Sequence, residues 1–273
     1  MGEMITCEKR QMPVRIMIYG TGGIGKTTFA ASMPNPIFIR TEDGLLTPGV
    51  ATFQRFCTIF DHVIAQIKWL VDNEHKYKTV VIDSLDWLQT LAEEQVLRDN
   101  PNWKTLSDGD YGAGWSALKA RFLQVIRGLE LCRQNKRMAV CLIAHTKEET
   151  HSDPEIAGVH RFAPKLYAGA CSVVTEWCDM VLLATRQRSA ALGEKERGNE
   201  RILRTVQGQN WVAKSRYPNI PEVLPLSWKA LKSCLFPPET PVVDVEPTQE
   251  TEKENGECEQ PIDGDMCGMP EAA

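Results

Sequence analysis

The sequence predicts an α/β fold in which helices flank a mostly parallel β-sheet. Apolar runs rich in Val and Ile alternate with longer segments of helical period, which is typical of repeated β-α-β units. A glycine-rich turn joins the first apolar run to the first helical segment, and a later apolar run ends in an acidic residue. These three observations predict a sheet with polar side chains gathered at the carboxyl ends of its strands.

Four apolar runs are the expected parallel strands, at residues 14–20, 37–41, 79–83 and 138–144. Helices are expected after the glycine-rich turn as far as about Met33, and over 61–73, 84–98, 115–134 and 162–177. Residues 179–185 and 201–206 are expected to pair as late antiparallel strands. Two segments are expected to be loops: 99–114, which is rich in Asp, Asn and Gly, and the polar stretch 145–160.

The composition is that of a globular protein. The chain has 273 residues, of which 42% are hydrophobic and 25% charged, and these values exclude a collagen-like, coiled-coil or wholly disordered chain. The longest apolar stretch, 138–144, is far shorter than the ~20 residues of a membrane-spanning helix. Because no signal segment is recognised at the N-terminus, we expect a cytoplasmic protein without membrane contact. The nine cysteines show no paired C-x-x-C spacing and are expected to be reduced thiols.

Charge divides the chain into two parts. The net charge is −5, but residues 237–273 carry eleven acids and one base, so the part before them is mildly basic. The acidic segment has low hydrophobicity and no periodicity, and such a chain buries too little apolar surface to offset its ordering entropy. We expect one domain over residues 1–236 and a disordered acidic tail over 237–273. The tail is either a solubilising extension or a nucleic-acid mimic that binds a basic surface.

Residues 20–27 match the phosphate-binding pattern G-x-x-x-x-G-K-[ST] in full. The residues expected to bind nucleotide are these eight and the one that follows, namely Gly20, Thr21, Gly22, Gly23, Ile24, Gly25, Lys26, Thr27 and Thr28. Glycines let successive backbone N–H groups turn toward a phosphate, and the start of the next helix adds its positive dipole end. Lys26 is expected to reach the β- and γ-phosphates, and the Thr27 hydroxyl to bind Mg²⁺. The alternative is a glycine-rich turn that matches by chance, and the strand before it and the helix after it weigh against this.

Asp83 ends the apolar run 79–83 and is the expected second metal residue. The carboxyl ends of parallel strands form the edge of the sheet where ligands bind. A carboxylate in this position holds the Mg²⁺ of P-loop enzymes. The alternative is a helix N-cap, since Asp and Ser84 after it both cap helices well.

Four segments resemble the motifs of RecA-like P-loop ATPases. They are residues 38–42, which end in Glu42, and residues 81–84, 142–145 and 213–217. The resemblance implies a RecA-like core that binds ATP and Mg²⁺, with Glu42 polarising the attacking water and Asp83 on the metal-binding strand. His145 stands where RecA proteins place a polar residue, usually glutamine, that senses the γ-phosphate.

The same resemblance implies that Lys214 and Arg216 are catalytic cations inserted into the ATP site of a neighbouring copy. It therefore implies a homo-oligomer with ATP sites at subunit interfaces. Simpler roles stay open for all four candidates. Glu42 fits a solvated loop acid, His145 a hydrogen-bonded structural residue, and the two cations ordinary surface residues.

The wider pattern is similar to that of the AAA-type phage nucleotide-binding proteins of the Sak group, which are RecA cores implicated in single-strand annealing. Residues 42–44, 111–115, 143–145 and 216–228 carry this resemblance, which covers about 13–228. It implies an ATPase of phage DNA recombination or single-strand annealing in the host cytoplasm. Its implied partners are single-stranded DNA and a single-strand-binding protein.

Two segments are candidates for contact with single-stranded DNA, because they mix aromatic and basic side chains. Segment 99–114 with its flank offers Trp103, Lys104, Tyr111 and Trp115, and segment 146–165 offers Lys147, His151, His160, Arg161 and Lys165. Acidic residues in both segments weaken this interpretation. The alternative function is a nucleotide-dependent switch that regulates a protein partner without binding DNA.

Overall fold

The computed structural model describes residues 12–44, 48–151, 158–187 and 200–236. The chain divides into two compact units, Met1–Pro237 and Pro238–Ala273, and the fold below is that of the first. The predicted acidic tail, 237–273, lies outside the described residues. Among the helices of the described segments, none combines the length and apolar character needed to cross a membrane.

In the described segments ten strands form one sheet, and the five at its centre are parallel. In spatial order they are β2 (Pro36–Arg40), β4 (Thr79–Asp83), β5 (Ala139–His151), β1 (Arg15–Gly20) and β7 (Met180–Arg186). A two-residue strand, β3 (Ala51–Thr52), adds to β2 in parallel. Strand β2, which follows the glycine-rich turn and α1 in the chain, is thus separated from β1 by β5 and β4. The carboxyl ends of the parallel part of β1, β4 and β5 meet at one edge of the sheet.

Three short strands complete the sheet on the other side of β7. They are β8 (Arg201–Arg204), β9 (Lys214–Ser215) and β10 (Val223–Pro225). Strands β8 and β9 pair with β7, and β10 pairs with β8, all antiparallel. The predicted α/β class, a mostly parallel sheet flanked by helices with late antiparallel strands, is confirmed.

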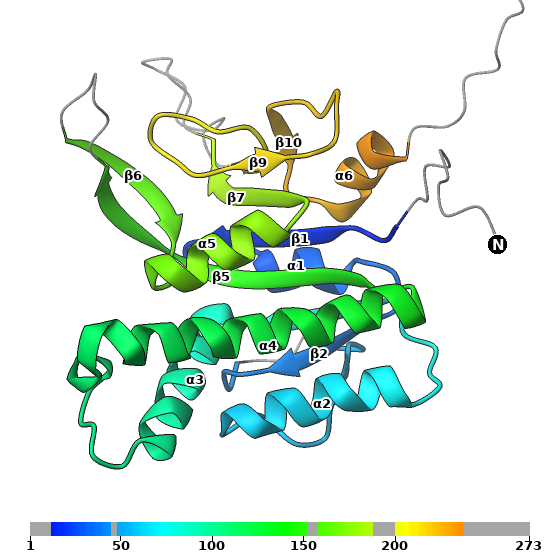
Figure 1. The fold of residues 1–273 in the computed structure, drawn as a ribbon. Helices are drawn as coiled ribbons and strands as arrows, with labels where there is room; N and C mark the ends of the chain where they lie inside the picture. Colours follow the sequence, from blue (N-terminus) through cyan, green and yellow to red (C-terminus); the bar gives the residue numbers. More distant parts are fainter. Residues whose placement is uncertain (1–11, 45–47, 152–157, 188–199, 237–273) are drawn as a thin grey trace, which may run out of the picture. The chain divides into compact units, whose positions relative to one another are not determined.

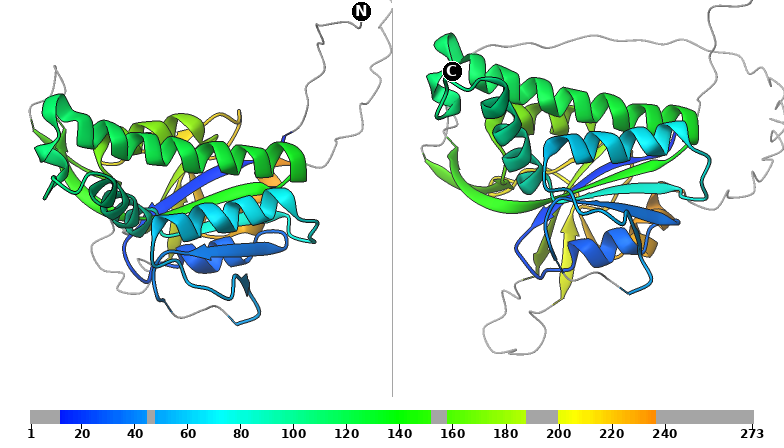
Figure 2. Two further views of the ribbon diagram at one scale, coloured as in Figure 1. Left: turned by 60° about the horizontal axis from the view of Figure 1, so that its bottom comes forward. Right: turned by 90° about the horizontal axis from the view of Figure 1, so that it is seen from below.

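Helices cover both faces of the sheet, which explains why its strands are apolar at successive positions. Met17 and Tyr19 of β1 belong to one core cluster, and Ile16 and Ile18 to the other. The first cluster lies under α2 (Phe60–Asp72), α3 (Leu85–Asp99), α4 (Ala113–Lys136) and α5 (Ala168–Trp177), and the second under α1 (Lys26–Ala31) and α6 (Trp228–Leu235) (Figures 1 and 2). Each large apolar side chain buried in this way contributes about 1.5–3 kcal/mol.

The longest helix, α4, buries one stripe of side chains spaced alternately by four and three residues. They are Leu118, Phe122, Val125, Leu129 and Cys132. This spacing keeps the stripe on one face of a helix, and the stripe packs against α2, α3 and α5 in the first core cluster. The helix ends at Arg137, whose φ of 55° is left-handed.

The structure corrects two predictions for the segment after residue 144. The stretch 145–160 is not simply a polar loop: β5 continues to His151 and pairs antiparallel with β6 (Val159–Pro164), while residues 152–157 lie outside the described part. The start of the predicted helix 162–177 is wrong as well, because β6 runs to Pro164 and α5 begins only at Ala168. The two strands form a ribbon beyond the edge of the main sheet, where alternating polar residues face solvent.

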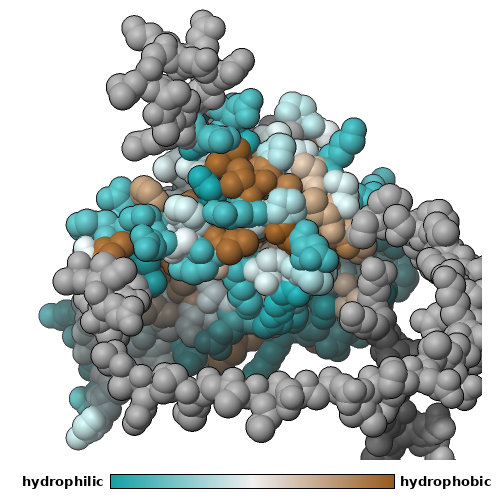
Figure 3. Space-filling model, turned by 90° about the horizontal axis from the view of Figure 1, so that it is seen from above, coloured by the Kyte–Doolittle hydropathy of each residue, from teal (hydrophilic) through white to brown (hydrophobic). Residues whose placement is uncertain are grey.

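Short elements were absent from the prediction. These are β3, β9, β10, α6 and the two 3₁₀ turns η1 (Leu106–Asp108) and η2 (Asp110–Gly112) within the predicted loop 99–114. The strands and 3₁₀ turns among them, of two or three residues each, carry too little periodicity to be recognised in a sequence, whereas the eight-residue α6 was missed. In Figure 3 most of the visible described surface is hydrophilic, with apolar side chains gathered in a small patch.

Candidate nucleotide-binding site

The glycine-rich turn lies where the pattern requires it, between the end of β1 and the start of α1. Gly20 must be glycine because a Cβ there would lie 2.4 Å from the backbone oxygen of Ala184 in β7. Gly25 has a φ of 115°, which side chains rarely allow, and a Cβ there would lie 3.2 Å from Arg201 Nη1. The sequence analysis missed Arg201, whose guanidinium reaches this turn from β8.

The other residues of the turn differ in their exposure to solvent. Thr21, Gly22 and Gly23 are exposed, while the Ile24 side chain is buried in the core under α1. Thr27 is half-buried and Thr28 is exposed on α1. The turn therefore presents its backbone outward and is anchored from below by one apolar side chain.

Lys26 is a buried cation held against the turn. The residue is only 6% exposed. Its Nζ donates hydrogen bonds to the carbonyl oxygens of Gly20 at 2.8 Å and Thr21 at 3.0 Å. Burial lowers the pKa of Lys26, and the charges of Asp83, Asp86 and Glu42 oppose that shift. A desolvated ammonium gains most from a nearby anion, so the residue suits a phosphate.

Thr27 and Asp83 meet as predicted, with the Thr27 hydroxyl donating to Asp83 Oδ2 at 2.8 Å. Burial raises the pKa of Asp83, and the hydrogen bond from Thr27 opposes that shift. The N-cap position of α3 is Ser84, without a side-chain cap hydrogen bond. A hydroxyl oxygen beside a buried carboxylate is the kind of hard oxygen pair that binds Mg²⁺, so these two residues fit the metal.

Glu42 follows β2 and reaches toward the end of β4. Its Oε2 accepts a hydrogen bond from the Ser84 hydroxyl at 3.1 Å. The neighbouring Thr41 donates from its backbone N–H to Asp83 O and from Oγ1 to Ser84 O. The half-buried Glu42 is therefore tethered to the end of β4 rather than extended as a solvated loop acid.

His145 lies next to Gly20 in the register between β5 and β1, and it forms an ion pair that the sequence analysis missed. Its Nδ1 lies 2.9 Å from Asp86 Oδ2, and its backbone N–H donates to Asp86 Oδ1 at 3.1 Å. The hydrogen bond that its ring donates to Asp86 raises the pKa of His145. Burial alone would raise the pKa of Asp86, but His145 lowers it.

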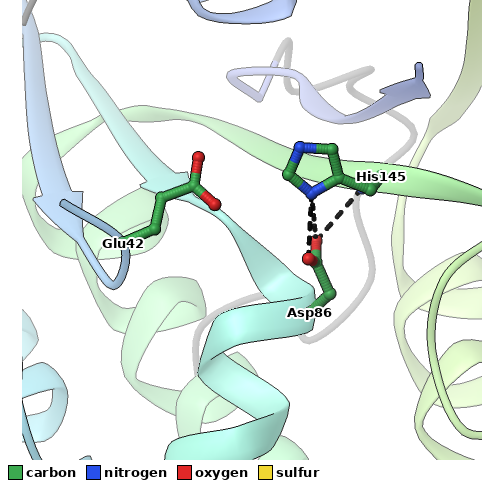
Figure 4. Close-up of side chains that lie close together, drawn as sticks. All are labelled: Glu42, Asp86 and His145. Atoms are coloured by element: carbon green, nitrogen blue, oxygen red, sulfur yellow. Dashed lines mark hydrogen bonds and ion pairs between the residues drawn. The ribbon is translucent and has the colours of Figure 1, made fainter. Parts of the chain in front are cut away.

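Glu42, Asp86 and His145 each offer an atom within 4.8 Å of the other two, and Figure 4 shows Glu42 and His145 on opposite sides of one gap. Asp86 lies in the first turn of α3, three residues after Asp83. That spacing places a second acid close to the same edge of the sheet. It was the signal that could have identified Asp86.

Lys214 and Arg216 do not join this site within the chain. Lys214 and Ser215 pair with Val181 and Met180 at the amino end of β7. Gly20 is level with Ala184 of β7, so the two residues lie three to four positions, or roughly 10–13 Å, along the sheet from the glycine-rich turn. Lys214 Nζ donates to the backbone oxygens of Thr175, Glu176 and Cys178 at the end of α5. The insertion of Lys214 and Arg216 into the ATP site of a neighbouring copy stays a prediction.

Arg216 belongs to a charge network at the same amino edge. Its Nη2 donates to Glu176 O at 2.5 Å, and its Nη1 lies 3.5 Å from Asp179 Oδ1. Asp179 also accepts three hydrogen bonds from Arg15, one from the backbone and two from the guanidinium. Burial alone would raise the pKa of Asp179, but the contacts with Arg15 lower it.

Some predicted DNA contacts lie together. Trp115, Lys147 and Lys165 line a pocket of about 530 Å³, together with Trp87 and Tyr167, which the sequence analysis missed. The Trp115 and Tyr167 rings are 4.6 Å apart. Lys147 Nζ, however, donates to Leu166 O at 3.0 Å and pairs with Glu149 at 3.1 Å.

The remaining candidates are dispersed. Tyr111, Lys104 and His160 are exposed, whereas Trp103 is half-buried and packs against the core. Arg161 pairs with Glu149 at 2.7 Å. The side chain of His151 lies outside the described residues.

Comparisons with known proteins gave one matching family model and a set of similar solved structures. A family model described as an AAA domain (AAA_24) matches residues 12–217. Among solved structures, the crystal structure of the RadB recombinase is similar, with 16% identity, a TM-score of 0.44, and coverage of 78% of this chain and 86% of that chain. The curated proteins gave no match.

Proposed function

This chain belongs to the AAA domain family, and we propose that it is an ATPase that hydrolyses ATP to ADP and phosphate with Mg²⁺. One observation carries the proposal. The glycine-rich turn with Lys26 and Thr27, the carboxylate of Asp83 and that of Glu42 come from three separate segments and converge on the carboxyl edge of one sheet. These are the parts that phosphoryl transfer needs, because its catalysis consists mostly of positioning and charge stabilisation.

Each residue has a distinct task in this proposal. The backbone of the turn and Lys26 bind the β- and γ-phosphates, and Thr27 and Asp83 hold Mg²⁺, which neutralises charge on the phosphates. Glu42 orients the attacking water and accepts its proton, while the Ser84 hydroxyl fixes its carboxylate. His145, beside Gly20, senses the γ-phosphate in this proposal.

We further propose that ATP turnover serves phage DNA recombination or single-strand annealing in the host cytoplasm, with single-stranded DNA as the substrate. The resemblance to the Sak group supports this role. So does the pocket with Trp87, Trp115, Tyr167 and two lysines, since stacking aromatic rings and cations suit single strands. A homo-oligomer with ATP sites at subunit interfaces and a single-strand-binding protein as partner belong to the same proposal.

One observation favours the second candidate, a nucleotide-dependent switch that regulates a protein partner. The pocket also contains Asp86 and Glu93, and Glu149 pairs with Lys147. These acids reduce the positive charge that a nucleic acid would meet.

ATP turnover with and without single-stranded DNA separates the two candidates. Recombination or annealing predicts stimulation by the DNA, together with DNA binding that weakens as salt concentration rises. A switch predicts turnover indifferent to DNA and no DNA retention. Lys26→Ala serves as the control for contaminating ATPases. Wild-type turnover no higher than that of this variant would contradict both candidates.

A further inference from the structure

Asp86 holds His145 at two points. Its carboxylate accepts a hydrogen bond from the backbone N–H of His145 at 3.1 Å, and it lies 2.9 Å from Nδ1 of the same residue. The side chain of Asp86 is 10% exposed and that of His145 is 30% exposed. A ring fixed through its own backbone and through one nitrogen has little freedom to rotate.

This contact determines which imidazole nitrogen is available. A carboxylate accepts but does not donate when it is ionised, so Nδ1 must carry a proton in this pair. The other nitrogen, Nε2, lies on the side of the ring away from Asp86 (Figure 4). The residues that face the same region are Lys26 from α1, Glu42 after β2 and Asp83 at the end of β4, each of which interacts electrostatically with the pair.

We propose that Asp86 is a positioning residue for ATP hydrolysis, because it orients the His145 ring and leaves Nε2 directed to the γ-phosphate position. In this proposal Asp86 acts on neither nucleotide nor water directly. Its effect passes through His145, as second-layer carboxylates fix the rings of functional histidines elsewhere. The kinetic part of the proposal rests on the proposed ATPase function, whereas the orientation of the ring does not.

Two substitutions separate hydrogen bonding from charge. Asp86→Ala removes the acceptor, while Asp86→Asn keeps an oxygen that can accept from His145 and loses the charge. We expect Asp86→Ala to lower kcat by about 10–100-fold, with Asp86→Asn intermediate. KM for ATP should stay near the wild-type value, because the Asp86 side chain hydrogen-bonds His145 and not the glycine-rich turn. Glu94→Gln is the matched control on the same helix, since Glu94 is exposed and pairs only loosely with Arg98 at 3.9 Å.

A double-mutant cycle tests whether the effect passes through His145. In a His145→Gln background, Asp86→Ala should change kcat less than twofold. Equal losses of kcat in both backgrounds would overturn the proposal, because they would show that Asp86 acts independently of the ring. Thermal unfolding verifies that the variants are folded, and Asp86→Asn serves if Asp86→Ala does not fold.

The nitrogen chemical shifts of His145 test orientation without any turnover. In the wild-type protein Nδ1 should carry a proton at pH 8, and in Asp86→Ala the neutral ring should change to the Nε2-protonated form. An unchanged tautomer would contradict the proposal. If the wild-type protein hydrolyses no ATP but the tautomer changes, the ATPase function fails while the orienting contact stands.

Discussion

The two edges of the central sheet use charged residues in opposite ways. At the carboxyl edge, Lys26 donates to backbone oxygens of its own turn, and Asp83 accepts from a hydroxyl. At the amino edge, Asp179 contacts Arg15 and Arg216, and Lys214 binds three carbonyl groups of α5. The first edge holds charges whose best partner is a ligand, and the second holds charges that already have protein partners.

This difference separates function from stability. A buried lysine without a carboxylate partner costs folding free energy that an anionic ligand offsets. A paired buried aspartate mainly fixes how β1, α5 and β7 meet. Substitutions at the carboxyl edge should therefore change turnover, and substitutions at the amino edge should change the free energy of unfolding.

The largest effect is expected for Lys26→Ala. Loss of the ammonium that neutralises the phosphates should lower ATP turnover by about 10⁴-fold, while the thermal unfolding midpoint stays equal or rises because a buried charge is removed. Steady-state phosphate release measures this. Lys232→Ala, an exposed lysine on α6, is the control. Turnover above one tenth of the wild-type rate in Lys26→Ala would break the comparison.

Glu42→Gln should lower kcat by about 10³-fold, because the amide cannot accept the proton of the attacking water. Affinity for ATP should change little, since the amide oxygen can still accept from Ser84. Single-turnover hydrolysis and a separate binding titration distinguish the two quantities. A wild-type rate of hydrolysis in Glu42→Gln would show that Glu42 is a loop acid without a catalytic role.

Asp179→Asn should have its main effect on stability. Removing one charge leaves the partly buried guanidinium of Arg15 with only the more distant Glu130, at 3.5 Å, as an ionised partner, which costs up to about 3 kcal/mol. Urea unfolding measures the change in free energy, and kcat at a temperature where the variant is folded should match the wild type. A loss of kcat as large as that of Glu42→Gln would show that the amino edge takes part in catalysis.

The smallest effect concerns pH and the Asp86–His145 pair. The pKa of His145 is raised from 6.5, so the stability it contributes is fully present below pH 6.5 and lost as pH rises through the raised pKa. The pKa of Asp86 is lowered from 3.8, so its contribution is present above pH 3.8 and lost as pH falls through the lowered pKa. The difference in free energy of unfolding between wild type and His145→Gln should thus be greatest between pH 3.8 and pH 6.5. We expect this difference to be less than about 1 kcal/mol. Urea unfolding at pH 5 and pH 8 measures it, and equal differences at both would contradict the assignment.

The sequence predicted the carboxyl edge better than the amino edge for a physical reason. The glycine-rich turn and Asp83 each follow an apolar strand directly, so chain order alone places them at the ends of parallel strands. Asp86 needed knowledge of which strand lies beside α3. Lys214 and Arg216 depend on the pairing of the two-residue strand β9 with β7, which leaves no periodic signal.

The ribbon of β5 and β6 also depends on strand pairing that the local sequence pattern does not reveal. Residues 145–151 are polar, and polarity favours a loop in a sequence-based prediction. The backbone nevertheless stays extended because β6 supplies hydrogen-bond partners from Val159–Pro164. Phe162 is further held by backbone hydrogen bonds to Asn210 and Val212, a contact across about fifty residues that local pattern cannot reveal.

Calorimetric titration with Mg²⁺ and a slowly hydrolysed ATP analogue tests the central claim most directly. The wild-type protein and Asp179→Asn should each bind one nucleotide per chain, and Lys26→Ala should lose that binding. The claim is contradicted if the wild-type protein takes up no nucleotide, or if Lys26→Ala binds it as tightly as the wild type does.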